Sequence, residues 1–526
     1  MTTHVGDEKT KPSAATELVE MASKIFRLGV TPDGEAFAVP REGPRVVATL
    51  RGNRQSLRAV LAREYFKASR RAAPQQALAD ALNVLEGQSL EVQPSSLHMR
   101  VAEHGGATWL DLGAQDGLAV RIDASGWCVV EQSAVLFRRT ALIGELPVPE
   151  RGGNIDDLWP LINVDEADRP LLLAWMVSCF WPDIAHPVPA LFGEQGSAKT
   201  TTQRMLVQLI DPSPVPSRKP PRDANSWVTA AAGSWLVGLD NLSEIPHWLS
   251  DSICRAVTGD GDVRRRLYSD GDHHVFAFRR CILINGIDVG VIRGDLAERL
   301  LPIRVNRIPD ECRRLDSEVW PAFEAVRPRL LGAVLDLVAG VAGIAPGLSL
   351  GCKPRMADFA RIVAAVDQLT GSNGLDAYIS KQASLAADGV SGDAVAQAIT
   401  EQLPNGFEGT SAELLERLRG PVSGRGWPAN GRTLTARLRR IAPVLRKTGW
   451  TVDDDGATNH DKVLRWAIIP PGRPEKPRNA SPQSPQSPQS PQGAGVAGVA
   501  GVENGTSQDD EAFQRAFAGV MARSAP

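Results

Sequence analysis

The feature that most constrains this fold is a glycine-bearing turn between an apolar run and a helical pattern. It lies within ALFGEQGSAKTTTQRML, residues 190–206 of a 526-residue chain. The apolar run predicts a buried strand over 188–192, and the spacing of apolar residues predicts a helix over 200–210. A turn between such a strand and such a helix points backbone N–H groups, and here a lysine, at an anion. The pattern therefore predicts a phosphate-binding loop in an α/β domain.

The turn departs at one position from the usual phosphate-loop pattern, G-x-x-x-x-G-K-[ST]. Gly193, Lys199 and Thr200 stand at the expected places, but Ala198 replaces the glycine before the lysine. We expect Ala198 to be tolerated because helical geometry at this point accepts the smallest side chain. A structural strand–turn–helix with a chance lysine is the alternative. The residues expected to bind a nucleotide are Gly193, Glu194, Gln195, Gly196, Ser197, Ala198, Lys199, Thr200 and Thr201.

A second apolar run ends in an acidic residue that is a candidate ligand for a metal ion. The run SWLVGLD ends at Asp240, 41 residues after Lys199. In phosphoryl-transfer sites such an acid holds Mg²⁺ together with the loop hydroxyl, here Thr200. The next residue is Asn241, where many such ATPases carry a second acid that aligns water, and Glu244 is the candidate substitute. The alternative is that Asp240 is only a turn residue at a strand end.

Two further polar residues fit the same site. Asn285 ends the apolar run CILIN and is a candidate contact for the γ-phosphate or the attacking water. Arg299 follows a short turn or helix and is a candidate to reach a neighbouring subunit's γ-phosphate, as an arginine finger does. Its alternative is a surface ion pair with Glu298 or Asp295. The predicted catalytic set is Lys199, Asp240, Asn285 and Arg299.

A basic hairpin is predicted between Asp240 and Asn285. The segments DVRRRLY and HHVFAF are predicted to be strands. The polar, glycine-bearing SDGD between them is predicted to be their turn. Such a hairpin is a candidate to follow a nucleic-acid backbone, and a solvated hairpin without that role is the alternative. The candidate DNA contacts here are Arg264, Arg265, Arg266 and His273, with His274 beside them.

The order of these motifs resembles the superfamily 3 helicases of the AAA+ class. More narrowly, it resembles the primase-associated helicases of phages and integrative elements, over roughly residues 150–310. The resemblance implies an ATPase that uses ATP and Mg²⁺. It also implies a homo-oligomeric ring, often a hexamer, whose central channel receives the basic hairpin and single-stranded or forked DNA. The departures at Ala198 and Asn241 bear on turnover rate more than on ATP binding. The matching segments are Gly193–Thr200, Leu239–Asp240, Thr258–Phe278, Asn285 and Asp295–Leu300.

The C-terminal part predicts a separate winged helix over 406–470. A helix start at 409–418 and a helical apolar pattern over 432–447 precede a strand, an acidic turn and a strand. Pro443 is expected to kink or split the second helix. This arrangement resembles winged-helix modules of phage-type replication proteins, and it implies duplex DNA binding; a module for protein contacts is the alternative. The candidate DNA contacts are Arg437, Arg439, Arg440 and Lys447, whereas the acidic turn 453–455 argues against that wing touching phosphate.

The expected organisation is therefore an α/β protein with a P-loop AAA+ ATPase core and accessory parts on both sides. The N-terminal α+β region is a candidate for binding a replication partner or for oligomerisation. It shows no spaced acidic pair of the kind a two-metal polymerase needs, so priming has no support there. The expected parts are a disordered tail (1–16), the N-terminal domain (17–150), the core (151–310), a helical region (311–405), the winged helix (406–470) and a disordered low-complexity tail (471–526).

Composition limits the kinds of binding partner and the cellular compartment that we expect for this protein. The net charge is −3, so DNA contacts must be local rather than spread over a polycation. The six cysteines form no CxxC pair, so a zinc ribbon is not expected. The apolar run 171–181 is about half the ~20 residues of a membrane span, which predicts a buried helix. With no signal-peptide pattern at the start, we expect a cytoplasmic protein without membrane contact.

Together the motifs predict an ATP-dependent DNA helicase or remodelling ATPase that serves replication of a phage or mobile element. An ATP-gated DNA-binding switch, or a replication initiator without processive unwinding, is the second interpretation, because Asn241 favours slow hydrolysis. A non-enzymatic scaffold that uses only the winged helix is the third.

Overall fold

The computed structural model describes most of the chain between residues 12 and 472. The tail expected at 471–526 falls almost wholly outside the described residues. The first helix begins at Ala14, so folded structure starts inside the tail expected at 1–16. The described residues are 12–51, 56–260, 262–265, 273–276, 278–286, 294–351, 354–391, 393–418, 427–456 and 463–472.

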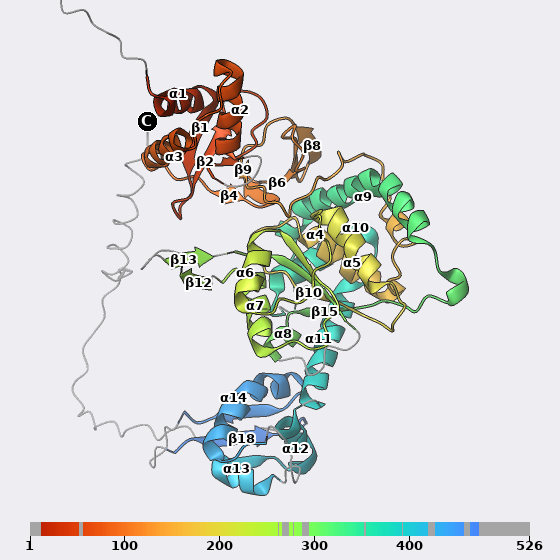
Figure 1. Ribbon diagram of the computed structural model, residues 1–526. Coiled ribbons are helices and arrows are strands. Elements are labelled where there is room, and N and C mark those ends of the chain that lie inside the picture. Colours follow the sequence, from red (N-terminus) through yellow and green to blue (C-terminus); the bar gives the residue numbers. More distant parts are fainter. Residues whose placement is uncertain are drawn as a thin grey trace, which may run out of the picture. The chain divides into compact units, whose positions relative to one another are not determined.

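The N-terminal part packs helices on a small antiparallel sheet ordered β1-β2-β3 (Figure 1). Ser13 and Ser56 cap two of its helices, since each side-chain oxygen accepts a backbone N–H in the first turn. Leu57, Leu61 and Tyr65 share the buried helix face that their spacing predicts. The elements are α1 (Ala14–Ile25), β1 (Phe26–Val30), β2 (Ala36–Pro40), β3 (Ala48–Thr49), α2 (Leu57–Ser69) and α3 (Gln75–Ser89).

A four-stranded antiparallel meander follows, ordered β5-β6-β7-β8. The short apolar runs and glycine-bearing turns over 97–130 predict this meander, and the structure confirms it. A short parallel pair, β4 with β9, lies beside it in the sequence. The strands are β4 (Leu97–His98), β5 (Val101–His104), β6 (Ala107–Asp111), β7 (Ala119–Asp123), β8 (Gly126–Val130) and β9 (Leu136–Phe137).

The central domain is built on a parallel sheet ordered β11-β14-β10-β15. Its strands are buried almost throughout, as in parallel sheets that are covered on both faces. The strands are β10 (Val188–Phe192), β11 (Leu236–Leu239), β14 (Cys281–Asn285) and β15 (Leu300–Arg304). The helices of this domain are α4 (Arg169–Ser178), α5 (Lys199–Ile210), α6 (Ala224–Ala232), α7 (His247–Thr258) and α8 (Gly294–Ala297), with short 3₁₀ turns at Ile155–Leu158, Glu166–Asp168 and Asp310–Cys312.

Alternate residues of the central strands face two separate hydrophobic cores. In β14, Cys281 and Leu283 pack in one core with α4 and α5, whereas Ile282 and Ile284 pack in the other with α6 and α7. Successive side chains of a strand point to opposite faces, so both faces of the sheet are covered by helices (Figure 1). The carboxyl ends of the parallel strands meet at one edge, which brings the phosphate loop, Asp240 and Asn285 together.

Long helices follow the sheet, as the sequence predicts. The segment 330–344 packs in one core with α4 and α5. Gly332 allows a close crossing, because a Cβ there would lie 1.8 Å from the Glu150 carbonyl oxygen. The helices are α9 (Asp316–Ile344), α10 (Ala357–Thr370), α11 (Gly374–Ser391) and α12 (Ala394–Gln402), with a 3₁₀ turn at Ala345–Gly347.

Two apolar helices bear on membrane contact. The run predicted as a buried helix at 171–181 corresponds to α4, in which Leu171–Ser178 are all buried. Within the described ranges, one helix, Asp316–Gly347, is long and apolar enough to span a membrane, and 50% of its most apolar window is buried inside the protein. Long apolar helices of this kind also occur in the cores of soluble proteins.

The C-terminal part has its own core around a three-stranded antiparallel sheet ordered β16-β18-β17. Val395 and Ile399 of α12 belong to this core, so the unit begins near residue 393 and not at the expected 406. Pro443 does not split the second helix, which runs unbroken through α14. The elements are β16 (Phe407–Thr410), α13 (Ser411–Arg417), α14 (Gly431–Lys447), β17 (Thr451–Asp454) and β18 (Arg465–Ile469).

Candidate nucleotide site

The predicted phosphate loop occupies the turn between β10 and α5. Its backbone corrects one expectation: Ala198 is not helical but left-handed, with φ 61° and ψ 30°, directly before the helix starts at Lys199. Gly196 is also left-handed, with φ 83°. The left-handed region costs an L-residue roughly 1–2 kcal/mol, a penalty that glycine escapes. The glycine of the usual pattern therefore has a conformational reason, and Ala198 adopts the same kind of backbone under strain.

Lys199 folds back over the loop. Its Nζ donates hydrogen bonds to the carbonyl oxygens of Gly193, at 2.7 Å, and Glu194, at 2.8 Å, and lies 3.3 Å from Ser197 Oγ. The ammonium group thus lies at the mouth of the turn, where an anion would meet it. Partial burial lowers the pKa of Lys199 from its ordinary value.

The two predicted Mg²⁺ ligands lie in direct contact. Thr200 Oγ1 donates to Asp240 Oδ1 at 3.0 Å, although 40 residues separate them in the chain. Asp240 is held in place because its backbone N–H donates to the Arg218 carbonyl oxygen at 2.7 Å. A hydroxyl and a carboxylate oxygen this close are the kind of oxygen ligands that Mg²⁺ uses beside phosphate. The donor set therefore fits the metal that the sequence predicts.

Asn285 is buried at this edge of the sheet, with 3% of its surface exposed. Its Oδ1 accepts the backbone N–H of Asn241 at 2.8 Å, and its Nδ2 donates to Gln203 Oε1 at 2.8 Å. Asn241 is left-handed, with φ 58°, so the turn after Asp240 is held by Asn285. Glu244, the candidate substitute base, is exposed.

Gln203 is a residue of this edge to which no sequence motif pointed. It lies on α5 four residues after Lys199, and its side chain is fully buried between the helix and the sheet. The available signal was a glutamine on a helix face otherwise filled by Leu206, Val207 and Ile210. A polar residue at such a position needs partners inside the protein.

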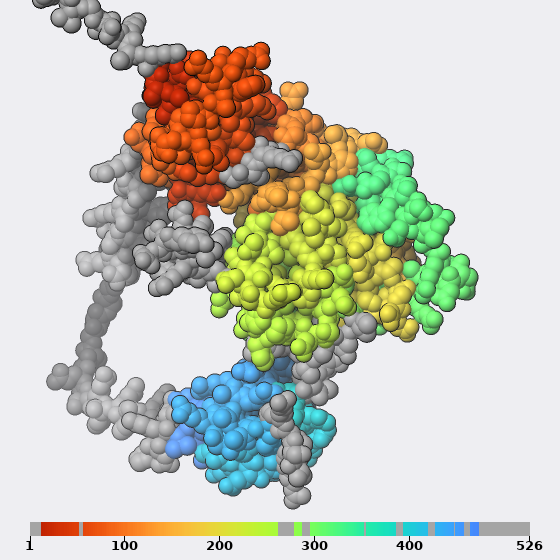
Figure 2. Space-filling model, viewed as in Figure 1, coloured from red at the N-terminus to blue at the C-terminus, as the bar shows by residue number. Residues whose placement is uncertain are grey.

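Arg313 was also missed. A Cβ built on Gly196 would lie 2.9 Å from Arg313 Nη2, so this guanidinium lies against the phosphate loop of its own chain. It also pairs with Asp310, at 2.9 Å, and its side chain is 53% exposed. Residues 310–318 are exposed and form part of the outer surface, in green in Figure 2. No spacing rule in the sequence pointed to this residue; it follows from β15 pairing beside β10.

Arg299 lies between α8 and β15. Its Nη1 donates to the Asp295 carbonyl oxygen at 2.8 Å, and the carboxylates of Asp295 and Glu298 both pair with Arg355. In the described part of the chain, no hydrogen bond or ion pair joins Arg299 to the loop 193–200. A role across a subunit boundary stays a prediction.

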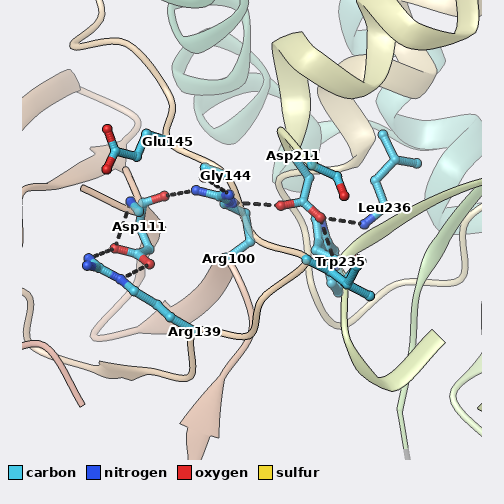
Figure 3. Close-up of polar contacts among 12 residues, drawn as sticks. Arg100, Asp111, Arg139, Gly144, Glu145, Asp211, Trp235 and Leu236 are labelled. Atoms are coloured by element: carbon cyan, nitrogen blue, oxygen red, sulfur yellow. Dashed lines mark hydrogen bonds and ion pairs between the residues drawn. The ribbon is translucent and has the colours of Figure 1, made fainter. Parts of the chain in front are cut away.

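A buried ion pair anchors the far end of α5 (Figure 3). Arg100 Nε contacts Asp211 Oδ1 at 2.7 Å, and neither side chain is exposed. Asp211 Oδ2 also accepts the backbone N–H groups of Trp235, at 2.8 Å, and Leu236, at 2.9 Å. The guanidinium of Arg100 donates further to the carbonyl oxygens of Asp111 and Gly144. The end of the phosphate-loop helix, the start of the Asp240 strand and the meander are thus fixed together.

The predicted DNA contacts of the C-terminal unit are partly engaged within the protein. Arg437 pairs with Asp393, and Arg439 lies 3.7 Å from Asp454. Arg440 is exposed, and no partner for it is found among the described residues. The Lys447 side chain lies outside the description.

The predicted basic hairpin is present in the backbone. The strands β12 (Asp262–Arg265) and β13 (His273–Phe276) pair antiparallel, with Arg265 opposite His273. Arg264, Arg265 and His273 therefore lie in these strands. Arg266 lies outside the described residues.

Two protein-family models match the sequence. The model of the actinomycete integrative conjugative element replication protein matches residues 155–388. The model of the C-terminal domain of the same replication protein matches residues 392–484. A search of curated proteins gave no match.

Similar solved structures are remote. The apo structure of the NrS-1 C-terminal region is 13% identical, covers 88% of this chain and 100% of its own, and has a TM-score of 0.37. The JCV helicase is 15% identical, covers 44% of this chain and 63% of its own, and has a TM-score of 0.23. The two family models match adjoining segments that together make up more than half of the sequence. The chain therefore belongs to the replication-protein family of actinomycete integrative conjugative elements.

Proposed function

We propose that this replication protein binds and hydrolyses ATP at the loop 193–200 and uses the cycle to unwind or remodel DNA. The observation that carries the proposal is the contact between Thr200 Oγ1 and Asp240 Oδ1, beside the Lys199 ammonium group. Three residues chosen from sequence motifs converge at the edge of a parallel sheet. A structural turn with a chance lysine gives no reason for an acid from another strand to meet the loop hydroxyl.

Each residue of the proposed site has a separate role in binding the nucleotide. Lys199 exchanges its carbonyl contacts for phosphate oxygens, and the N–H groups at the start of α5 face the same anion. Thr200 and Asp240 would hold Mg²⁺, which neutralises phosphate charge when bound. Arg313 adds positive charge from the same chain, and Arg299 acts on a neighbouring subunit's nucleotide in a homo-oligomeric ring.

DNA binding is proposed at two places. The hairpin β12–β13 would follow single-stranded or forked DNA in the ring, and α14 would contact duplex DNA as the last helix of a winged helix. On α14, Arg440 is exposed and has no partner in the part of the chain that is described, so it is free for phosphate. We place this activity in the cytoplasm, without membrane contact.

A second function is favoured by one specific observation. The residue after Asp240 is Asn241, whose left-handed backbone is tied to Asn285, and no acid stands there to align water. Slow hydrolysis follows from this arrangement, and it suits an ATP-gated DNA-binding switch or initiator better than a processive motor.

The test is the ATPase rate of the full chain with and without single-stranded DNA, together with its mass in solution. Lys199→Ala should abolish DNA-stimulated hydrolysis, whereas Lys24→Ala, an exposed lysine on α1, should leave it unchanged. Hydrolysis by Lys199→Ala at the wild-type rate would refute the site. Strand displacement separates the two functions, since ATP-dependent DNA binding without unwinding is the result expected of the switch.

A further inference from the structure

We infer that Gln203 is a positioning residue that fixes the side-chain amide of Asn285 for recognition of the terminal phosphate. The inference rests on the proposed ATP site and adds to it a residue that does not touch nucleotide. It concerns how the site distinguishes a triphosphate from a diphosphate.

The orientation of each amide follows from its partners. The backbone N–H of Asn241 can only donate, so the atom of Asn285 that faces it at 2.8 Å must be Oδ1. The Nδ2 of Asn285 then faces Gln203, whose atom at 2.8 Å must be the acceptor, Oε1. The remaining Gln203 atom, Nε2, lies 3.3 Å from Ser217 Oγ, an acceptor for it. One chain of hydrogen bonds therefore sets both amides in a single orientation.

Burial makes this chain rigid. Gln203 is 0% exposed and Asn285 is 3% exposed, so an amide turned the wrong way would leave buried polar atoms unpaired. Gln203 Nε2 would also lie 2.8 Å from a Cβ at Gly238, so it is packed closely against β11. The absence of a side chain at Gly238 makes room for the Gln203 amide. This close packing leaves no space for a water molecule beside the amide.

The arrangement leaves one donor of Asn285 for nucleotide. An amide Nδ2 carries two protons, and Gln203 takes one of them. The other N–H has no acceptor among the described residues, and Asn285 ends β14 at the sheet edge where Asp240 follows β11. Since Gln203 lies four residues after Lys199 on α5, the helix that carries the phosphate loop also sets the direction of this donor. Loss of the Gln203 acceptor would free the Asn285 amide to turn.

The test compares affinities for two nucleotides. Dissociation constants of Mg·ADP and Mg·ATPγS are measured by calorimetry on the full chain, and their ratio reports recognition of the terminal phosphate. Gln203→Met keeps the size of the side chain but removes the acceptor, so we expect the ratio to fall about tenfold, as for one lost hydrogen bond to a charged group. Gln203→Glu keeps an acceptor for Asn285, and the Ser217 hydroxyl can donate to it. The ratio in this variant should therefore be close to that of the wild type.

Two further variants control the experiment. Gln208→Met makes the same change on the same helix, at a side chain whose Nε2 donates to the Ser213 carbonyl oxygen at 3.1 Å, and it should leave the ratio unchanged. The Gln203→Asn side chain is one methylene too short to reach Asn285, so this variant should lower the ratio of the two dissociation constants as Gln203→Met does. It serves as the test if the Met variant does not fold.

The outcomes are distinct. A lower melting temperature in Gln203→Met with a wild-type ratio would mean that the residue is only structural, and would overturn the inference. Tight wild-type binding of both nucleotides with a ratio near one would also overturn it. A wild-type protein that binds neither nucleotide would instead refute the proposed function, and the inference with it.

Discussion

Replacing Ala198 by glycine tests the backbone of the phosphate loop directly. Ala198 has φ 61° and ψ 30°, and an L-residue in that region is destabilised by roughly 1–2 kcal/mol relative to glycine. Glycine in turn makes the unfolded chain more flexible, which costs about 0.4–1 kcal/mol of stability. The difference between the two effects leaves Ala198→Gly about 0–1.6 kcal/mol more stable than the wild type.

A matched control has the opposite sign. Ala230 lies inside α6 (Ala224–Ala232), where glycine costs about 1 kcal/mol because it is a poor helix former. The assay is urea unfolding followed by tryptophan fluorescence, since Trp175, Trp227 and Trp235 are all buried in the central domain. We expect Ala198→Gly to raise the midpoint or leave it unchanged, and Ala230→Gly to lower it. Equal destabilisation by both would mean that Ala198 is helical and does not have a left-handed backbone.

Three further perturbations have defined outcomes. Arg100→Ala leaves the Asp211 carboxylate buried without its cation, so unfolding free energy should fall by about 3–5 kcal/mol; a loss below about 1 kcal/mol in urea unfolding would contradict the buried pair. Burial lowers the pKa of Lys199 below the ordinary 10.5, and phosphate binds its cation, so Mg·ADP affinity should be constant near neutral pH. It should then weaken as pH rises through the lowered pKa; affinity that stays flat up to pH ~10.5 in titration calorimetry would contradict this role. Arg313→Ala should weaken Mg·ADP binding about fivefold, and Arg314→Ala should not; equal affinities would remove Arg313 from the site.

Much of the site could be predicted because its residues follow one another in recognisable order. A strand, a glycine-bearing turn and a lysine at the start of a helix define the loop without tertiary information. Asp240 and Asn285 each end an apolar run, and the carboxyl ends of parallel strands meet at one edge, so their proximity follows from topology. The covering of both faces of β14 likewise follows from its unbroken apolar run, residues 281–284, because a strand without polar alternation is buried on both sides.

The parts that escaped prediction depend on contacts between distant segments. The backbone of Ala198 could not be read from its small side chain, because local helix propensity pointed to the wrong region of φ and ψ. Gln203 and Asn285 are 82 residues apart, and only the strand order brings them together. Arg313 reaches Gly196 because β15 pairs with β10, a pairing that no local pattern encodes. Burial of Arg100 with Asp211 is likewise invisible in a sequence where arginine is abundant.

The central claim is that the loop 193–200 binds a nucleoside triphosphate with its ammonium group and its hydroxyl–carboxylate pair. The most direct measurement is the affinity of the full chain for Mg·ATPγS, by titration calorimetry, in wild type, Lys199→Ala and Asp240→Asn. The account predicts saturable binding by the wild type, loss of binding in Lys199→Ala, and loss of the Mg²⁺ dependence in Asp240→Asn. Equal, Mg²⁺-dependent binding by all three proteins, or no binding by the wild type, would contradict it.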